Sequence, residues 1–265
     1  MDTGTDMLLV DVDDDGIATV TFNNPSKHNA LSRAMREALP GALGALEADD
    51  AVRVIVATGA GEKAFVSGAD ISEFRDQRTT PEARKAYDQA AAVGGRAWGE
   101  LSKPVIAMIR GYCIGGGLLT AMQTDIRIAA EGSQFGVPAA RLGLGYGYGG
   151  VKALVDLVGA SWASEILFSA RRLSAEEALH IGLVNRVVEP ERLRDDVWEL
   201  ARTMAGNAPM TVAACKAAIR EATRDPDRRD LARVAEMVEA CFRSEDYLEG
   251  QKAFMEKRDP NFRGR

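Results

Sequence analysis

One stretch of the chain, residues 103–130, constrains the fold and the function more than any other: KPVIAMIRGYCIGGGLLTAMQTDIRIAA. Its apolar run at residues 105–109 has the length and composition of a buried strand. A turn and three glycines follow, and then come a pattern typical of a helix at 118–122 and one typical of a strand at 125–129. This order of strand, glycine turn, helix and strand predicts an α/β fold.

The three glycines, Gly115, Gly116 and Gly117, stand where a strand is expected to lead into a helix. Glycine lets another group lie directly against the backbone, and the first N–H groups of a helix have no partner within it. These N–H groups also lie at the positive end of the helix dipole. Such a junction suits a developing negative charge, as in an oxyanion hole. Close packing of helix on strand explains three glycines about equally well.

A second glycine turn, Gly68-Ala69-Asp70, follows an expected short strand at residues 64–67. Two Val-Ile strands, at 54–55 and 105–106, each lead into a glycine-bearing turn, and they lie about fifty residues apart, at the upper end of the periods that indicate stacked units. Two turns that expose backbone N–H groups form an oxyanion hole if they converge on one point.

The rest of the chain divides into a mixed α/β core, residues 1–190, and a helical region, residues 191–265. In the core we expect a hairpin around residues 14–16, a helix capped by Ser32, and a capping box formed by Ser174 and Glu177. The sequence also predicts a loop at 135–150, short helices at 151–158 and 161–169, and a last strand at 184–188. After these come four helices, at 191–205, 209–221, 227–243 and 245–257; terminal helices with large apolar faces often pack on another subunit.

Composition excludes several classes of function. The chain has 265 residues, of which 46% are hydrophobic, and its formal net charge is −6. A nucleic-acid-binding protein usually carries a basic surface, so we expect no nucleic-acid partner. An anionic small ligand stays possible, because it needs only a local cluster of lysine and arginine.

The cysteines and the N-terminus indicate a cytoplasmic protein. Cys113, Cys215 and Cys241 are far apart and form no CxxC pair, so neither a disulfide framework nor a metal site is expected. No basic region precedes the first short apolar run, as a signal peptide would require, and no apolar stretch is long enough to span a bilayer. We therefore expect no membrane partner.

Several spaced motifs together resemble the crotonase superfamily, the enoyl-CoA hydratase/isomerase family. The two longest are residues 63–74, KAFVSGADISEF, and the stretch 103–130. Shorter ones are NPSKHNAL at 24–31, FGVP at 135–138, AEEALHIGLVN at 175–185, and the tail AFMEKRDPNFRGR at 253–265. The resemblance covers nearly the whole chain, and the combination is far more specific than any one motif.

The resemblance implies a spiral of ββα turns followed by C-terminal helices that build a homotrimer or a dimer of trimers. It implies an acyl-CoA thioester as ligand, with coenzyme A as part of the substrate and no separate cofactor. By motif position, the N–H groups of Ala69 and Gly116 bind the thioester oxygen as it becomes an enolate. Losing one such preorganised donor costs roughly a hundredfold or more in rate.

The resemblance also implies which residues contact coenzyme A and the acyl group. The nucleotide contacts fall on the first loop, on the turn after residue 68 and on the tail, at Lys27, His28, Ala30, Ala69, Asp70, Ile71, Phe254 and Lys257. The tail residues reach a coenzyme A, possibly that of a neighbouring subunit. The acyl pocket falls on Gly115, Leu119, Pro138, Ala139 and Leu142. Lys27 and Lys257 suit phosphates on charge grounds, although for each residue taken alone a solvated lysine is the better interpretation.

The chain departs from the hydratases of this family at two positions. They carry a glutamate two residues after the glycine triplet and another right after the proline of the FGxP motif, where this chain has Leu119 and Ala139. Adding water to a double bond needs one group to activate the water and one to protonate carbon, and neither side chain can do so. We therefore expect thioester binding and enolate stabilisation but not ordinary hydration.

Tyr146 is the residue that we expect to act in place of the carboxylates. It stands in LGYGYGG, residues 144–150, the loop that borders the acyl pocket in the family. Family decarboxylases that act on malonyl-type CoA esters have a tyrosine near here, and Tyr146 falls closer to it than Tyr148. A phenol can orient a carboxylate or protonate an enolate. Packing is the alternative role for both tyrosines.

Other candidates are weaker. The glycines at 145, 147 and 150 match the dinucleotide fingerprint formally but follow no long buried strand. Cys113 has no nearby histidine to activate it, and His180 and Arg141 are expected to be structural or solvated. Asp70 is expected to hold its own turn. Glu131 and Glu165 are acids that the sequence does not place.

Three functions remain open. The first is a crotonase-type lyase or isomerase that forms a thioester enolate, by decarboxylation, isomerisation or thioester hydrolysis. The second is an acyl-CoA-binding protein without turnover. The third is an enoyl-CoA hydratase, as in fatty acid β-oxidation, whose acids have moved elsewhere.

Overall fold

The computed structural model describes residues 1–70 and 80–265. Within the second range it does not describe the side chains of residues 81, 83, 84, 86–88, 91 and 92. Ile71, expected near the adenine, lies outside the described residues. None of the helices in the described ranges is long and apolar enough to cross a membrane.

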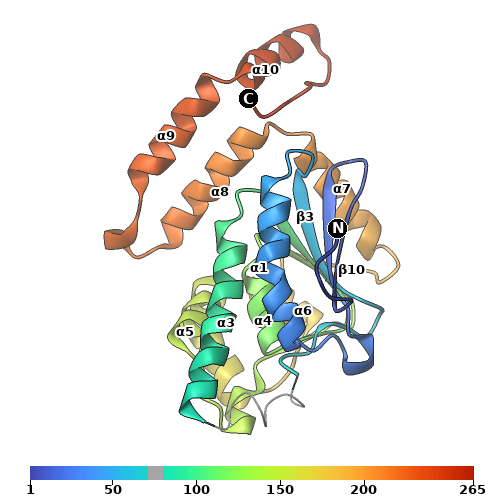
Figure 1. Cartoon of the computed structure of the whole chain (residues 1–265), viewed down its shortest axis with the longest axis vertical. Helices are drawn as coiled ribbons and strands as arrows, with labels where there is room; N and C mark the ends of the chain where they lie inside the picture. Colours follow the sequence, from blue (N-terminus) through green and yellow to red (C-terminus); the bar gives the residue numbers. More distant parts are fainter. Residues whose placement is uncertain (71–79) are drawn as a thin grey trace.

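A six-stranded sheet forms the centre of the molecule (Figure 1). Its first two strands form the expected antiparallel hairpin, and the remaining neighbours pair in parallel. In spatial order the strands are β1 (Leu8–Val12), β2 (Ile17–Phe22), β3 (Val54–Gly59), β5 (Val105–Ile109), β7 (Ile126–Ala130) and β10 (Arg186–Val188).

A smaller sheet lies beside the first. Its strands are β4 (Ala64–Val66), β6 (Tyr112–Ile114), β8 (Gln134–Gly136) and β9 (Leu173–Ser174). The chain visits the large sheet, then the small sheet, then a helix, three times in succession: β3, β4 and α3 (Pro81–Glu100); β5, β6 and α4 (Gly116–Met122); β7, β8 and α5 (Tyr148–Ser169). The prediction of a spiral of ββα turns is therefore confirmed.

Both faces of the large sheet are covered, because side chains alternate along a strand. On β3, Ile55 and Ala57 belong to the main core, which also holds the apolar face of α1 (Arg33–Ala48). Val54 and Val56 point the other way, onto α7 (Leu193–Ala205). The buried residues of α7 on this face are Leu193, Val197, Trp198 and Ala201.

The predicted caps are confirmed. The Ser32 hydroxyl accepts the N–H of Met35 at 3.3 Å and starts α1. Ser174 and Glu177 form the capping box of α6 (Ala175–His180).

The expected loop at residues 135–150 was wrong at both ends of the segment, whereas residues 143–147 form no helix or strand. Phe135 belongs to β8, where it pairs with Cys113 and Leu173, a 3₁₀ turn spans Pro138–Leu142, and α5 already begins at Tyr148. Pairing with neighbouring strands outweighs the high glycine content of this segment. The two expected short helices form α5, which Gly159 interrupts with a φ of 76°.

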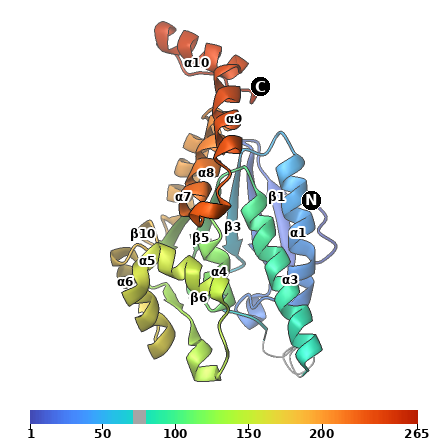
Figure 2. The same cartoon turned by 90° about the vertical axis from the view of Figure 1, so that its left-hand side faces the viewer.

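The last three helices stand apart from the sheets, whereas α7 lies on the large one (Figure 2). They are α8 (Pro209–Thr223), α9 (Leu231–Phe242) and α10 (Glu245–Glu256). The division of the chain at residue 190 stays a prediction. Large apolar side chains remain exposed on these helices, at Ile219, Leu231, Val238, Phe242, Tyr247, Leu248, Phe254 and Met255.

Two cations of α8 fix it to the core. The Lys216 ammonium, only 7% exposed, lies 2.7 Å from Asp125 Oδ2. Burial lowers the pKa of Lys216, and Asp125 opposes this by favouring its charged form. The Arg220 guanidinium donates to carbonyl oxygens at the end of α3, those of Trp98, Gly99 and Leu101, at 2.6 to 3.2 Å. These carbonyls would otherwise lack partners at the helix terminus.

We predict that Gly117→Ala lowers the free energy of unfolding by at least about 2 kcal/mol, because overpacking against rigid atoms is costly. A Cβ at Gly117 would lie 2.0 Å from the backbone oxygen of Val66, so α4 can lie on β4 only without it. Urea unfolding at a fixed protein concentration measures the change. Gly99→Ala is the control, since a Cβ there meets no atom within 4 Å. A Gly117→Ala variant as stable as the wild type would contradict this packing.

Candidate active site

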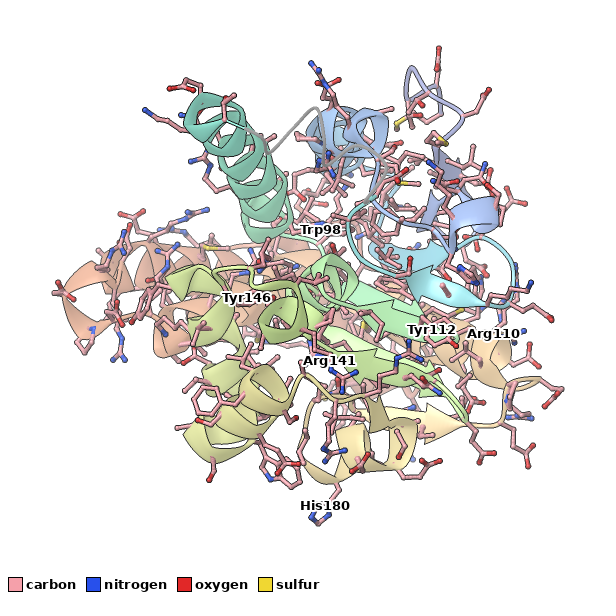
Figure 3. The ribbon with its side chains drawn as sticks, turned by 90° about the horizontal axis from the view of Figure 1, so that it is seen from below. Trp98, Arg110, Tyr112, Arg141, Tyr146 and His180 are labelled. Carbon is pink, nitrogen blue, oxygen red and sulfur yellow. The ribbon has the colours of Figure 1, made fainter. Side chains whose placement is uncertain are left out.

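A cavity of about 370 Å³ lies between α1, α3, α4 and the segment that joins β8 to α5. Figure 3 shows Trp98 of α3 and Tyr146 of the joining segment near each other in this part of the molecule. Most of the lining is apolar. The side chains that shape it include Leu31, Met35, Leu39, Trp98, Ile114, Leu119, Val137, Pro138, Leu142, Leu144 and Tyr146.

The two glycine turns meet at one wall of this cavity. Gly68 has a φ of +120° and Gly115 a φ of +55°, and both values disfavour any residue with a side chain. A Cβ on Gly115 would lie 4.0 Å from the Cα of Gly68, and one on Gly116 would lie 3.7 Å from the nitrogen of Ala69. The turns predicted separately from sequence are therefore brought into contact.

Backbone pairing leaves an N–H group available in each turn. Leu31 N donates to Gly68 O at 2.8 Å, and Asp70 N donates to Leu31 O at 3.1 Å, so the groups on both sides of Ala69 N are used. Gly115 N donates to Gly136 O at 2.8 Å, and Gly116 is the first residue of α4. Within the described part of the chain, neither Ala69 N nor Gly116 N donates a hydrogen bond to protein.

A buried amide fixes the loop that carries Leu31. Asn29 is fully buried, and its Nδ2 donates to Ala60 O at 2.9 Å and to Ala64 O at 2.7 Å. Its Oδ1 accepts the N–H of Asn24 at 3.0 Å. Because buried backbone groups need partners, this side chain fixes the first loop against the start of β4 and the turn that precedes it.

Tyr146 extends into the cavity lining, as the sequence indicated. Its ring packs beside Leu119 and Gly150, since a Cβ on Gly150 would lie 2.8 Å from the ring. The hydroxyl oxygen is buried and has no hydrogen-bond partner among the described residues. Burial raises the pKa of the phenol well above its ordinary value, so it keeps its proton at neutral pH.

The predicted acyl-pocket residues Gly115, Leu119, Pro138, Ala139 and Leu142 all line this cavity. Among the residues that the structure describes, no carboxylate, histidine, lysine or cysteine does so. Arg36 and Tyr146 are the titratable side chains of that described lining. Arg36 donates to Leu31 O at 2.7 Å, and so its charge lies beside the Ala69 turn.

The predicted nucleotide contacts lie next to the Ala69 turn. Asp70 is 6% exposed, and its carboxylate lies 2.7 Å from the Lys27 ammonium, so it has a structural ion pair as well as its place in the turn. His28 is exposed and lies edge-on to Tyr112, with ring centroids 5.9 Å apart. Ala30 is buried. Whether these residues contact coenzyme A stays a prediction.

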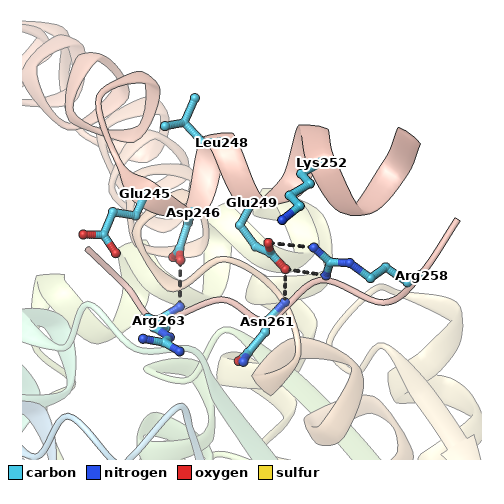
Figure 4. Close-up of a pocket in the computed structure, with 8 residues that line it drawn as sticks. All are labelled: Glu245, Asp246, Leu248, Glu249, Lys252, Arg258, Asn261 and Arg263. Carbon is cyan, nitrogen blue, oxygen red and sulfur yellow. Dashed lines mark hydrogen bonds and ion pairs between the residues drawn. The ribbon is translucent and has the colours of Figure 1, made fainter. Parts of the chain in front are cut away.

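Phe254 and Lys257 do not approach this cavity within the chain. Phe254 lies on α10, with 84% of its side chain exposed, and Lys257 ends that helix. The tail beyond them is tied back along α10 (Figure 4). There Glu249 accepts two hydrogen bonds from Arg258 and one from Asn261 N, which lower its pKa to about 2.

The weaker candidates lie elsewhere. Cys113 is fully buried, and burial raises its thiol pKa, which leaves it inert. His180 is exposed and projects from the edge of the molecule in Figure 3. Glu165 pairs with Arg171 at 2.7 Å, and neither Glu131 nor Arg141 is among the described lining residues.

Sequence reasoning missed Arg36, Met35 and Leu39 of α1 and the inner face of α3. Gly94 and Gly95 of α3 also line the cavity. Two glycines inside an otherwise regular helix indicate close approach or open space, and that signal could have found this wall of the cavity.

The enoyl-CoA hydratase/isomerase family model matches residues 13–265. The short-chain-enoyl-CoA hydratase of Clostridium acetobutylicum is 40% identical over 91% of this chain and 92% of its own length. The crotonyl-CoA hydratase of Syntrophomonas wolfei is 37% identical over 93% and 94%. A crystal structure of an enoyl-CoA hydratase/carnithine racemase from Magnetospirillum magneticum matches with a TM-score of 0.92 at 36% identity, covering 98% of this chain and 97% of that one.

The match therefore extends over nearly all of the sequence and of the fold, including both glycine turns. This chain belongs to the enoyl-CoA hydratase/isomerase family, the crotonase superfamily.

Proposed function

We propose that this protein binds an acyl-CoA thioester, holds the thioester oxygen between Ala69 N–H and Gly116 N–H, and stabilises the enolate that forms when carbon dioxide leaves the α-carbon. The two available N–H groups on one wall of the cavity support the proposed binding of the thioester oxygen. Donors fixed in place before the reaction stabilise a localised oxyanion without reorganisation.

We choose decarboxylation over the other reactions because none of the described lining residues can act as a base. Hydration and thioester hydrolysis need a group that activates water, and isomerisation needs one that removes the α-proton. The guanidinium of Arg36 has no acceptor atom, and burial raises the pKa of Tyr146 so that its phenol keeps its proton; neither side chain therefore accepts a proton. Decarboxylation needs no base, because the electron pair of the breaking carbon–carbon bond enters the enolate.

Tyr146 is the proposed proton donor. As the bond between the α-carbon and the carboxylate breaks, carbon dioxide leaves and the thioester becomes an enolate. The phenol proton then passes to the α-carbon, and the thioester carbonyl re-forms. Water returns a proton to the tyrosinate, and the hydroxide that remains combines with the released carbon dioxide to give bicarbonate. Before decarboxylation, the same hydroxyl donates a hydrogen bond to the substrate carboxylate, and the positive charge of Arg36 favours an anionic acyl substituent.

A hydratase is the second candidate, because relatives at 37% and 40% identity carry that name. Such an enzyme would draw its acids from outside the described lining. An acyl-CoA-binding protein without turnover is the third. For assembly we propose a homotrimer or a dimer of trimers in the cytoplasm, supported by the apolar side chains exposed on α8, α9 and α10.

We predict that the enzyme releases carbon dioxide from a malonyl-type thioester and does not hydrate crotonyl-CoA. Tyr146→Phe should lower carbon dioxide release about a hundredfold or more, the usual contribution of a positioned acid. It should also weaken binding of the malonyl-type thioester, which loses a hydrogen bond to its carboxylate, while binding of a saturated thioester without a carboxylate changes little. A coupled assay measures carbon dioxide release, and the absorbance of crotonyl-CoA measures hydration. Hydration of crotonyl-CoA that survives Tyr146→Phe would favour the hydratase, and binding without any product would favour the binding protein.

Tyr146→Phe should also raise the free energy of unfolding of the ligand-free protein by about 1 kcal/mol, because a buried hydroxyl without a partner destabilises the fold. Tyr148→Phe is the matched control: Tyr148 is 78% exposed, so its hydroxyl lies in water and its removal should leave stability unchanged. Urea unfolding of the wild type and of the two variants measures these free energies. A loss of stability in Tyr146→Phe would show that the hydroxyl serves the fold instead.

A further inference from the structure

The cavity runs along α4, away from the place proposed for the thioester oxygen. Gly116, Leu119, Thr120 and Gln123 all line it, so it follows one face of this helix from its first residue to its end. Seven residues at the helical rise of 1.5 Å span about 10 Å. A group that starts at Gly116 N–H and fills the cavity therefore has that depth available.

The inner end of the cavity lies at the end of α3. Trp98 lines it and is only 2% exposed, so its indole is a fixed wall. Two cations on α8 hold the ends of α3 and α4 together there. Arg220 donates to the carbonyl oxygen of Trp98, and Lys216 pairs with Asp125, two residues beyond Gln123. This end is thus far from Gly116 and rigidly built.

One turn before Trp98, α3 presents open space instead of side chains. Gly94 and Gly95 both line the cavity. A Cβ on Gly94 would make ordinary contact with Leu39 at 3.9 Å, and one on Gly95 would meet no atom within 4 Å. Glycine disfavours a helix interior, and no positive φ requires it at either position. We therefore attribute the two glycines to the space that they leave in the cavity, and not to the backbone conformation of the helix.

The side chains around this space are mostly apolar, with Met35, Leu39, Leu119 and Trp98 on its sides, and Thr120 and Gln123 of α4 add uncharged polar groups. Arg36, the cation among the described lining residues, is bonded to Leu31 O at the thioester end. An uncharged hydrocarbon chain suits the inner half, because each methylene removed from water adds to affinity.

We propose that Gly94, Gly95 and Trp98 determine acyl-chain length, and that the substrate carries an unbranched chain of medium length. An extended hydrocarbon chain advances about 1.3 Å for each carbon–carbon bond of about 1.5 Å, so a depth of about 10 Å accommodates roughly eight carbons. The names of two relatives specify short-chain and crotonyl thioesters, so this chain would differ from them in substrate length. The inference rests on the proposed function only in taking an acyl-CoA as the ligand.

Calorimetry with saturated thioesters tests this inference without any turnover. We expect butanoyl-, hexanoyl- and octanoyl-CoA to bind about fourfold more tightly for each added methylene, and decanoyl-CoA to gain nothing further. Gly95→Leu fills the open space and should weaken octanoyl-CoA binding at least tenfold while butanoyl-CoA binding stays within twofold. Trp98→Phe should extend the gain to decanoyl-CoA.

Gly99→Leu is the matched control on the same helix, because position 99 is exposed and does not line the cavity. Its affinities should equal those of the wild type. An affinity that does not depend on chain length in the wild type, or identical series for Gly95→Leu and Gly99→Leu, would overturn the inference and leave the proposed reaction untouched. Conversely, a protein that shows this length dependence but no carbon dioxide release would contradict only the proposed reaction.

Discussion

The pairing of Leu31 with the turn that contains Ala69 is the interaction on which the site depends. Leu31 uses its N–H and its carbonyl to engage the peptide groups on either side of Ala69 N. The N–H of Ala69 lies between these two peptide groups and cannot reach Leu31, so it stays available to a ligand. The Gly115–Gly136 hydrogen bond fixes the second turn in the same way, directly before α4.

A site built from main-chain groups has a physical consequence. The donors are positioned by strand pairing and by glycines in the left-handed region, not by side chains that a single substitution would remove. Binding of a thioester oxygen can therefore persist while the residues above the α-carbon change. In this chain Leu119, Ala139 and Tyr146 of the cavity lining are the residues proposed for that place, and they make an apolar wall with one buried hydroxyl.

The sequence predicted the parts of the molecule that local chemistry determines. Strand, glycine turn and helix were read at 105–122 because apolar runs and glycines at junctions carry strong signals. The Ser32 cap and the capping box of Ser174 followed from side-chain hydrogen bonding within one turn. The contact between the two glycine turns could only be stated as a condition, because it depends on the packing of two separate ββα units.

What the sequence did not predict depends on tertiary packing. The segment at 135–150 was taken as a loop because its glycines hide the pairing of Phe135 with Cys113 and Leu173. Arg36 and Trp98 were missed as lining residues, since helical periodicity does not say which neighbour a helix faces. Phe254 and Lys257, on α10 and at its end, lie outside the lining of their own chain's cavity, and the sequence had left open that they reach a neighbouring subunit.

The most direct test of the central claim observes the thioester carbonyl itself. The ¹³C resonance of an acyl-CoA labelled at the carbonyl carbon reports hydrogen bonds to its oxygen, whatever reaction follows. Gly116→Pro removes one N–H at a helix position that tolerates proline, and Gly116→Ala keeps it, since a Cβ there meets its nearest neighbour at 3.5 Å. We predict a downfield shift on binding that Gly116→Ala retains and Gly116→Pro largely loses. An equal shift in both variants would contradict the account.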